Sequence, residues 1–304
     1  MKLDNNNKAV LLIGFGGPTK PDEVRPFLET VTRGRGIPQA RIEEVAHHYE
    51  AVGGRSPYNE IVMRQAKALA ERLRCAVYVG MRNWSPFLSD TLQVMARDGV
   101  KYSVGFVLAP HRSEASFDRY VESARQAQRA LGPNAPEIEY VGPWHTHPLF
   151  VESVAKQVRT AASKLSPKQR ERACLIFTAH SIPCAMAEQS RYAQELHESA
   201  ALVADKLGWR RWFVAYQSRS GNPYEPWLGP DVGELLASLK EDAAVVMPLG
   251  FLCENVEILY DLDIEARSIA QQAGVTMVRA SAVNDDPVFI QMIAELVHEQ
   301  LAGH

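Results

Sequence analysis

The chain has 304 residues, of which 46% are hydrophobic and 23% charged, and this composition excludes a disordered, collagenous or coiled-coil protein. Its 33 Lys and Arg residues against 36 Asp and Glu residues leave a formal net charge of -3, without the basic excess that binding to nucleic acid or anionic lipid requires. The length suits two domains of similar size.

The apolar runs and the cysteines indicate the cellular compartment in which the protein works. The longest apolar runs, such as residues 243–252, are about half the roughly 20 residues that cross a bilayer, so no membrane-spanning helix is expected. The N-terminus is typical of a buried strand and not of a signal peptide. Cys75, Cys174, Cys184 and Cys253 form no CxxC pair, which predicts reduced thiols and no disulfide framework or clustered metal site. We therefore expect a cytoplasmic protein.

Short apolar runs alternate along the chain with segments of helical period, the pattern of parallel strands joined by crossover helices. Strands are predicted at residues 9–15, 76–79, 102–108 and 138–141, and again at 174–178, 212–216, 244–248 and 276–279. Helices are predicted to begin near residues 21, 59, 86, 116 and 147, and a final one near 287. The fold class is thus α/β, with two Rossmann-like domains, 1–145 and 146–304, each a parallel four-stranded sheet flanked by helices, and a cleft between them.

Ligands of such sheets sit beyond the carboxyl ends of the strands, so functional residues are expected just after each strand. That rule selects Phe15, Arg82, His111, His180, Gln217 and residues 251–257. The turn at residues 14–18 is a weak match to a dinucleotide-binding loop. Thr19 stands where a third glycine is needed, and Pro18 lacks the N–H that a phosphate would use. We interpret it as a tight turn at the edge of a cleft.

His180 follows a buried strand and precedes a helix. An imidazole there can exchange a proton near neutral pH or bind a borderline metal, although a lone histidine is more often a hydrogen-bonded core residue. A second feature supports the functional interpretation. Glu257, Asp261 and Glu265 recur every four residues, so they share one face of a helix, where like charges destabilise it unless a cation offsets them.

The acidic row could also be a solvated helix face, but Glu257 follows directly from a buried strand, where a cleft should open. Together, His180, Glu257, Asp261 and Glu265 indicate a site for a hard or borderline divalent cation, such as ferrous iron in transit. Neither an HExxH nor a GxSxG motif occurs, so no hydrolase motif is present.

Several motifs follow one another in a fixed order along almost the whole chain. They are GFGGP at 14–18, VTRGRGIP at 31–38, HYEAVGGRSP at 48–57, VGMRNWSPF at 79–87, PHRSEASFDRY at 110–120, TAHSIP at 178–183, QSRSG and WLGP within 217–230, and GFLCENVEILYDLDIE at 250–265. In this order they resemble the ferrochelatases, enzymes that insert ferrous iron into a porphyrin. The resemblance implies two chelatase-type domains and a lyase of haem biosynthesis.

The same resemblance implies roles for individual residues. His180 is the proton acceptor or metal-handling residue, with Glu257 as its partner, and Asp261 and Glu265 continue a metal-delivery path on a helix that is partly of π type in relatives. The cleft residues that would contact the porphyrin or its propionates are Phe15, Arg33, Tyr49, Ser56, Ser113 and Tyr120. Phe15, Trp84 and Tyr120 could form aromatic walls.

Departures from the family pattern bear on the substrate. Phe15 stands where some bacterial relatives have a tyrosine able to bind iron, which favours metal entry from the His180 side. His48, Arg112 and Asn255 also differ from common family residues and leave the choice of porphyrin open. No cysteine follows Cys253, so we do not expect the C-terminal iron–sulfur cluster of some members. No tightly bound cofactor is expected, and Fe²⁺ is a substrate.

The segments at 31–38 and 48–54 are most similar to enzymes that use coproporphyrin III, and Arg33, Arg35 and Arg55 would suit its more anionic ring. Protoporphyrin IX is the alternative ring. Two other functions stay open: a cobalt or nickel tetrapyrrole chelatase, and a protein that binds haem or a tetrapyrrole without catalysis. The expected partners are porphyrin and ferrous iron, with weak peripheral membrane contact at an apolar cleft lip and contacts with other haem-pathway enzymes as further hypotheses.

Overall fold

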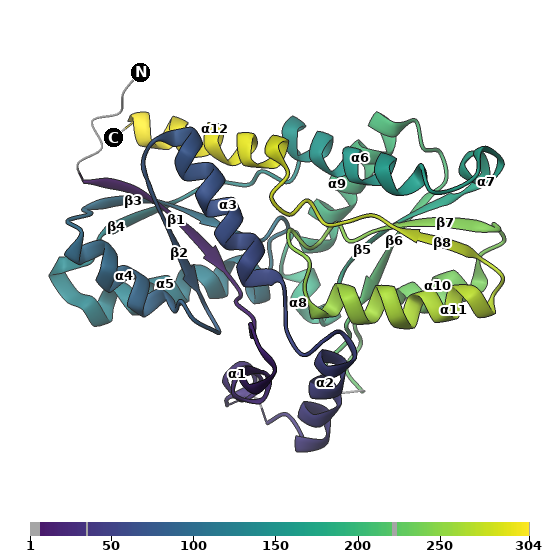
Figure 1. Cartoon of the computed structure of the whole chain (residues 1–304), viewed down its shortest axis with the longest axis horizontal. Coiled ribbons are helices and arrows are strands. Elements are labelled where there is room, and N and C mark those ends of the chain that lie inside the picture. The colour runs from purple at the N-terminus through teal and green to yellow at the C-terminus, as the bar shows by residue number, and fades with distance from the viewer. Residues whose placement is uncertain (1–6, 35, 221–223, 304) are drawn as a thin grey trace.

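The computed structural model describes residues 7–34, 36–220 and 224–303, and within them it has two parallel four-stranded sheets. The first contains β1 (Lys8–Gly14), β2 (Ala76–Met81), β3 (Tyr102–Val107) and β4 (Glu137–Tyr140) in the order β2-β1-β3-β4. The second contains β5 (Cys174–His180), β6 (Trp212–Gln217), β7 (Ala243–Met247) and β8 (Thr276–Arg279) in the order β6-β5-β7-β8. Figure 1 shows the two sheets side by side, and the predicted α/β class is confirmed.

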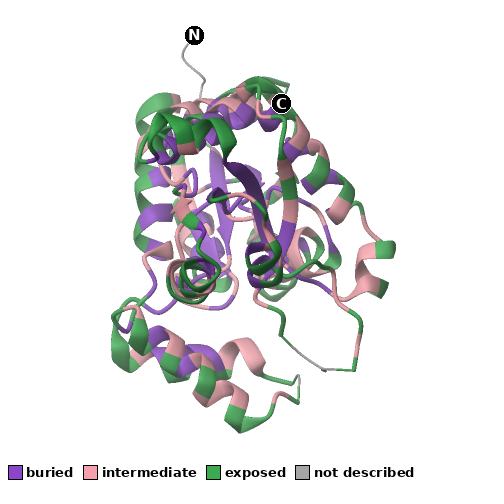
Figure 2. Ribbon diagram, turned by 90° about the vertical axis from the view of Figure 1, so that its right-hand side faces the viewer, coloured by how far each residue is buried: buried purple, intermediate pink, exposed green. Residues whose placement is uncertain are grey.

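Both faces of the first sheet are covered. Successive side chains of a strand point to opposite faces, and β1 is apolar on both: Leu11 packs with α4 (Leu88–Arg97) and α5 (Arg119–Leu131), and Leu12 packs on the other side. That side is formed by α3 (Tyr58–Leu73) and α12 (Pro287–Gly303). A strand apolar on both faces is typical of a parallel sheet covered on both sides. Figure 2 shows the buried strands in the interior and the helices around them, with the exposed residues on their outer sides.

The second sheet is built in the same way. Phe177 of β5 packs toward α6 (Pro148–Ala162) and α9 (Tyr192–Leu207), while Ile176 packs toward α10 (Val232–Ser238), α11 (Arg267–Gln272) and the π-helix η4 (Ile258–Ala266). The π-helix confirms the expectation drawn from the family resemblance. Short elements complete the described chain: η1 (Pro21–Glu23), η2 (Glu114–Asp118), η3 (Gly132–Asn134), α7 (Pro167–Arg172) and α8 (Cys184–Glu188).

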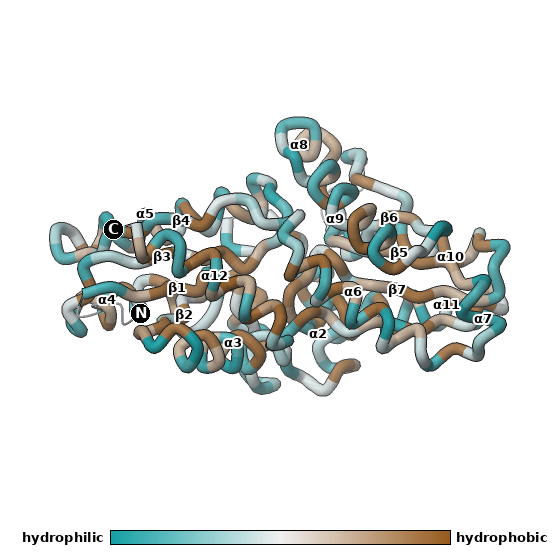
Figure 3. Tube along the Cα trace, turned by 90° about the horizontal axis from the view of Figure 1, so that it is seen from above, coloured by the Kyte–Doolittle hydropathy of each residue, from teal (hydrophilic) through white to brown (hydrophobic). Residues whose placement is uncertain are grey.

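The two halves share one core. Helix α12 returns from the second half, contacts α3 and β3, and also packs on α6, so one buried apolar cluster runs through both halves. Figure 3 shows the apolar strands of both sheets in one line across the molecule. The division at 145/146 stays a prediction, because this cluster crosses it. The structure describes no helix that is both long enough and apolar enough to cross a membrane.

A pair of helices, α1 (Val24–Thr32) and α2 (Gln39–Ala51), projects beyond the strand ends of both sheets (Figure 1). Phe27 and Leu28 of α1 pack with Ala46 and Tyr49 of α2, and Val256 of the second half joins the same buried cluster. We call α1 and α2 the lip. Helix α2 was not predicted, although Ile42, Val45, Ala46 and Tyr49 follow helical spacing.

Gly250 allows β5 and the segment after β7 to lie close together. A Cβ atom on Gly250 would lie 2.5 Å from the Cβ of Ala179 and 2.8 Å from its Cα. We expect Gly250→Ala to lower the free energy of unfolding by about 1–3 kcal/mol, since overpacking of a tight core costs that much. Urea denaturation measures this. Gly142→Ala, where the added Cβ has no atom within 4 Å, is the control, and equal midpoints for the two variants would contradict the expectation.

Candidate active site

A cavity of 560 Å³ opens beyond the carboxyl ends of the strands, between the two sheets and the lip. Eight predicted site residues line it: Phe15, Tyr49, Ser56, Ser113, Tyr120, His180, Glu257 and Asp261. Residues from both halves and from the lip therefore meet in one place. Its walls are mainly apolar, with side chains such as Phe27, Leu28, Val31 and Ile42, as in most small-molecule sites.

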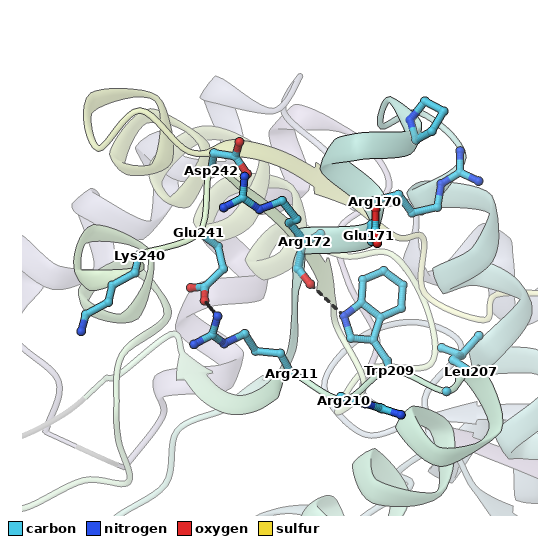
Figure 4. A pocket seen from close by; sticks show the side chains of 13 residues that line it. Arg170, Glu171, Arg172, Leu207, Trp209, Arg210, Arg211, Lys240, Glu241 and Asp242 are labelled. Atoms are coloured by element: carbon cyan, nitrogen blue, oxygen red, sulfur yellow. Dashed lines mark hydrogen bonds and ion pairs between the residues drawn. The ribbon is translucent and has the colours of Figure 1, made fainter.

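A larger groove of 960 Å³ lies at the opposite edge of the second sheet (Figure 4). Its lining comes from the segments that precede β5, β6 and β7, and it includes Arg172, Trp209 and Lys240. None of the predicted site residues lines it. Open α/β sheets bind ligands beyond the carboxyl ends of their strands, so the smaller cavity is the candidate active site.

His180 and Glu257 face each other in this cavity. His180 ends β5, and Glu257 lies just before η4, in the segment that follows the neighbouring strand β7. The Nε2 atom of His180 lies 3.7 Å from Oε1 of Glu257, and both side chains are partly exposed, 32% and 40% respectively. The juxtaposition that the strand-end rule predicted is therefore present in the structure.

The second ring nitrogen of His180 is occupied. Nδ1 lies 2.5 Å from the carbonyl oxygen of Ser181, which can only accept a hydrogen bond. In the neutral ring this partner assigns the proton to Nδ1 and leaves the lone pair on Nε2. Tyr192 holds the same turn, because its hydroxyl donates to the carbonyl of His180 at 2.9 Å. Nε2 is thus prepared to accept a proton or bind a metal on the side of Glu257.

Asp261 lies one turn beyond Glu257 and lines the same cavity. Its Oδ2 accepts a hydrogen bond from Ser218 and lies 3.5 Å from the amide nitrogen of Gln217. Burial raises the pKa of Asp261 to about 7; the Ser218 hydrogen bond acts in the opposite direction, and the negative charge of Glu257 adds to the rise. Asp261 can therefore exchange a proton near neutral pH.

Glu265 extends the row out of the cavity. It is an exposed residue of η4 and does not line the cavity; partial burial of its carboxyl group, together with the charges of Asp231 and Glu44, raises its pKa. The three acidic residues thus run from the cavity to the molecular surface along one helix. Across the whole described part of the chain, no three His, Cys, Asp or Glu side chains are arranged to hold a metal ion.

The aromatic residues contribute unequally. Tyr49 and Tyr120 are buried, and burial, with the Glu257 charge as a further cause for both, raises the pKa of each hydroxyl well above its ordinary value, so both are neutral donors. Phe15 lies edge-on to Phe27 in the wall. Trp84 does not line the cavity: its indole donates to Glu23 at 3.1 Å and its ring supports Phe27, so the expectation that it forms a wall was wrong.

The polar residues predicted to contact the porphyrin do not all line the cavity. Ser56 and Ser113 line the cavity, but the Ser113 hydroxyl already caps η2 through Ser116. Arg33 is exposed just after α1 and is not part of the lining, so its contact with the substrate stays a prediction. Arg35 lies outside the described residues.

Comparison with known proteins agrees with this geometry. A sequence profile of the family named Ferrochelatase matches residues 7–301. The chain belongs to the ferrochelatase family. The chain is 42% identical to the coproporphyrin III ferrochelatase of Mycobacterium avium, over 97% of this chain and 88% of the relative. It is 40% identical to that of Mycolicibacterium smegmatis, over 97% and 90%, and 41% identical to a ferrochelatase of Rhodopirellula baltica, over 96% and 86%.

Solved structures support the fold. The ferrochelatase chain is similar to the sirohydrochlorin chelatase SirB from Bacillus subtilis subspecies spizizenii, in complex with cobalt, with a TM-score of 0.55 and 13% identity over 97% of this chain and 96% of the other. SirB from Bacillus subtilis with Fe3+ gives a TM-score of 0.59 at 12% identity, with the same coverage. The predicted chelatase-type architecture is confirmed. As a ferrochelatase, the protein is a lyase that inserts Fe²⁺ into a porphyrin in haem biosynthesis.

Sequence reasoning missed several residues of this ferrochelatase cavity. Arg41, Arg119 and Ser218 line it. Arg41 belongs to the unpredicted helix α2, so its position could have been found from the helical spacing of Ile42 and Val45. Ser218 follows the end of β6, where the strand-end rule had stopped at Gln217. Arg119 begins α5 beside Tyr120, and no signal in the sequence distinguishes it from a solvated arginine.

Proposed function

We propose that His180 accepts the protons that the porphyrin nitrogens lose, while Glu257 attracts the incoming Fe²⁺. The observation that carries this proposal is the 3.7 Å separation of His180 Nε2 and Glu257 Oε1 within one cavity. Insertion replaces two pyrrole N–H protons by one Fe²⁺, so the site needs a base that works near neutral pH and a carboxylate that holds the metal only briefly. The Nδ1 contact to Ser181 keeps the accepting lone pair on the cavity side.

We further propose that Fe²⁺ reaches this pair along the acidic row of η4. Glu265 is exposed, Asp261 lines the cavity, and Glu257 lies opposite His180. Carboxylate oxygens suit ferrous iron, and single carboxylates spaced along a helix hold it less tightly than a three-ligand site. The metal can therefore pass from one residue to the next. Iron enters as a substrate, and the proposed chemistry requires no resident cofactor.

Coproporphyrin III is the porphyrin that we propose as substrate. The mycobacterial relatives at 40% to 42% identity are named coproporphyrin III ferrochelatases. The cavity also combines apolar walls with three arginines, Arg41, Arg82 and Arg119, and guanidinium groups bind carboxylates strongly. A ring with four carboxylates can use more of these cations than protoporphyrin IX, which has two.

A direct comparison of the two porphyrins tests this preference. We expect kcat/KM with coproporphyrin III to exceed that with protoporphyrin IX by about tenfold or more, because one additional charge-assisted hydrogen bond contributes about 1.5–3 kcal/mol. The purified protein is mixed anaerobically with Fe²⁺ and each ring, and the conversion of the free-base absorption spectrum is followed. Equal rates would contradict the preference, while no conversion of either ring would contradict the iron-insertion mechanism itself.

Location and further partners are also proposals. We propose that the enzyme works in the cytoplasm; the four cysteines are described as free thiols, as is usual in a reducing compartment. Weak membrane contact at the lip and contacts with other haem-pathway enzymes stay predictions.

A further inference from the structure

Gln217 makes hydrogen bonds to both of the segments that carry His180 and Glu257. It ends β6 and is 1% exposed. In the sheet it is the direct neighbour of His180, and its backbone carbonyl accepts a hydrogen bond from the N–H of Ser181 at 2.8 Å. The backbone of Gln217 thus holds the turn that carries His180.

The side chain of Gln217 holds the other half of the site. Its amide nitrogen donates to the backbone carbonyl of Glu257 at 3.1 Å and lies 3.5 Å from the Asp261 carboxylate. Its amide oxygen accepts a hydrogen bond from the hydroxyl of Thr178 at 2.8 Å. The two ends of the amide are not interchangeable, since the backbone carbonyl of Glu257 can only accept a hydrogen bond and must therefore face the amide nitrogen.

Glu257 and Asp261 belong to a different segment from His180, so their alignment depends on a link between the segments. Gln217 makes that link through one residue: its backbone contacts the His180 turn, and its side chain contacts Glu257 and Asp261. A buried polar network that is fully paired fixes a single geometry. Nothing in the proposed chemistry requires Gln217 to touch iron or porphyrin.

We infer that Gln217 is a positioning residue that sets the Glu257–Asp261 row against His180 and thereby the handling of Fe²⁺. This inference rests on the proposed function of that pair. It separates two properties of the enzyme: the capture and use of iron depend on Gln217, whereas porphyrin binding depends on the lip and on the walls formed by residues such as Phe15 and Tyr120.

The substitution Gln217→Glu tests the inference with little change of shape. It replaces the donating amide nitrogen by an oxygen that faces the carbonyl oxygen of Glu257, which can only accept a hydrogen bond. We expect KM for Fe²⁺ to rise about 10- to 100-fold, the usual cost of losing a residue that orients metal ligands, while the Kd of the free-base porphyrin, measured by fluorescence quenching, changes less than about twofold. Gln272→Glu, on the exposed surface of α11, makes the same chemical change away from the site and should match the wild type.

Thr178→Val provides a second, independent variant. It removes the hydroxyl that orients the Gln217 amide and leaves every group near iron in place. We expect the same direction of change in KM for Fe²⁺, by about 2- to 12-fold for one lost hydrogen bond. Combined with Gln217→Glu it should add almost nothing, since both substitutions act through one amide.

The outcomes are distinguishable. A wild-type rate of iron insertion with an unchanged KM for Fe²⁺ in Gln217→Glu or in Thr178→Val would overturn the inference and leave the proposed function intact. Equal losses in iron use and porphyrin binding would also overturn it, because they indicate general damage to the fold. If the wild type itself inserts no iron, the proposed function fails first.

Discussion

Replacing His180 by alanine will lower the rate of Fe²⁺ insertion by about 10²- to 10⁴-fold, the contribution of a positioned general base. The Nε2 lone pair that faces Glu257 at 3.7 Å is lost, and water must then take the pyrrole protons. Porphyrin binding should persist, because the walls of the cavity are formed by other residues. Anaerobic stopped-flow absorption gives the rate, and fluorescence quenching by the bound ring gives the Kd.

Several variants sharpen this result. Glu257→Gln keeps the shape of the side chain but removes its charge. The fold-decrease in rate caused by Glu257→Gln should not multiply with the fold-decrease caused by His180→Ala, since the two groups act as a unit. His47→Ala, on the exposed face of α2, is the histidine control and should retain the wild-type rate. Added imidazole should restore part of the activity of a His180→Gly variant. An unchanged rate in His180→Ala would show that another group accepts the protons.

The sheets were predictable because their strands are buried on both faces. β5 and β8 were predicted to begin at Cys174 and Thr276, where the structure also begins them, since runs of apolar and β-branched residues define buried parallel strands. Helix α2 was not predicted because, unlike these strands, it is not apolar on all sides. Its apolar residues lie on one side only, facing α1 and the cavity, and polar residues such as Gln39, Glu43 and Glu44 fill the rest of the segment.

The site was predictable where strand ends determine position. His180 and Glu257 follow neighbouring strands of one parallel sheet, whose carboxyl ends must meet at the same edge. Arg33 lies after the projecting helix α1, where sequence pattern gives no information about direction, and the structure leaves it exposed outside the cavity. The Gln217 network was not visible in the sequence either, because the partners of its amide come from two other segments: Thr178 from β5, and Glu257 and Asp261 from the segment at the start of η4.

Asp261→Asn is expected to stabilise the fold at alkaline pH while it weakens the use of iron. Burial raises the pKa of Asp261 from 3.8 to about 7, so the folded state disfavours the charged carboxylate. A carboxyl group whose pKa is raised by folding contributes to the free energy of unfolding. This contribution is fully present below the pKa of the unfolded chain, near 3.8, and is lost as the pH rises toward 7. Above pH 7 the ionised group reduces the free energy of unfolding.

Asparagine cannot ionise, so this cost disappears in the variant. At pH 8 we expect its free energy of unfolding to exceed that of the wild type by about 2–4 kcal/mol, at 1.36 kcal/mol for each unit of pKa shift, with the gain shrinking toward pH 4. Urea denaturation at both pH values measures it, with Asp205→Asn on the exposed surface of α9 as the control. A gain that is independent of pH would contradict the assignment. If KM for Fe²⁺ rises in the same variant, the enzyme retains a destabilising carboxylate at this position because iron must pass it.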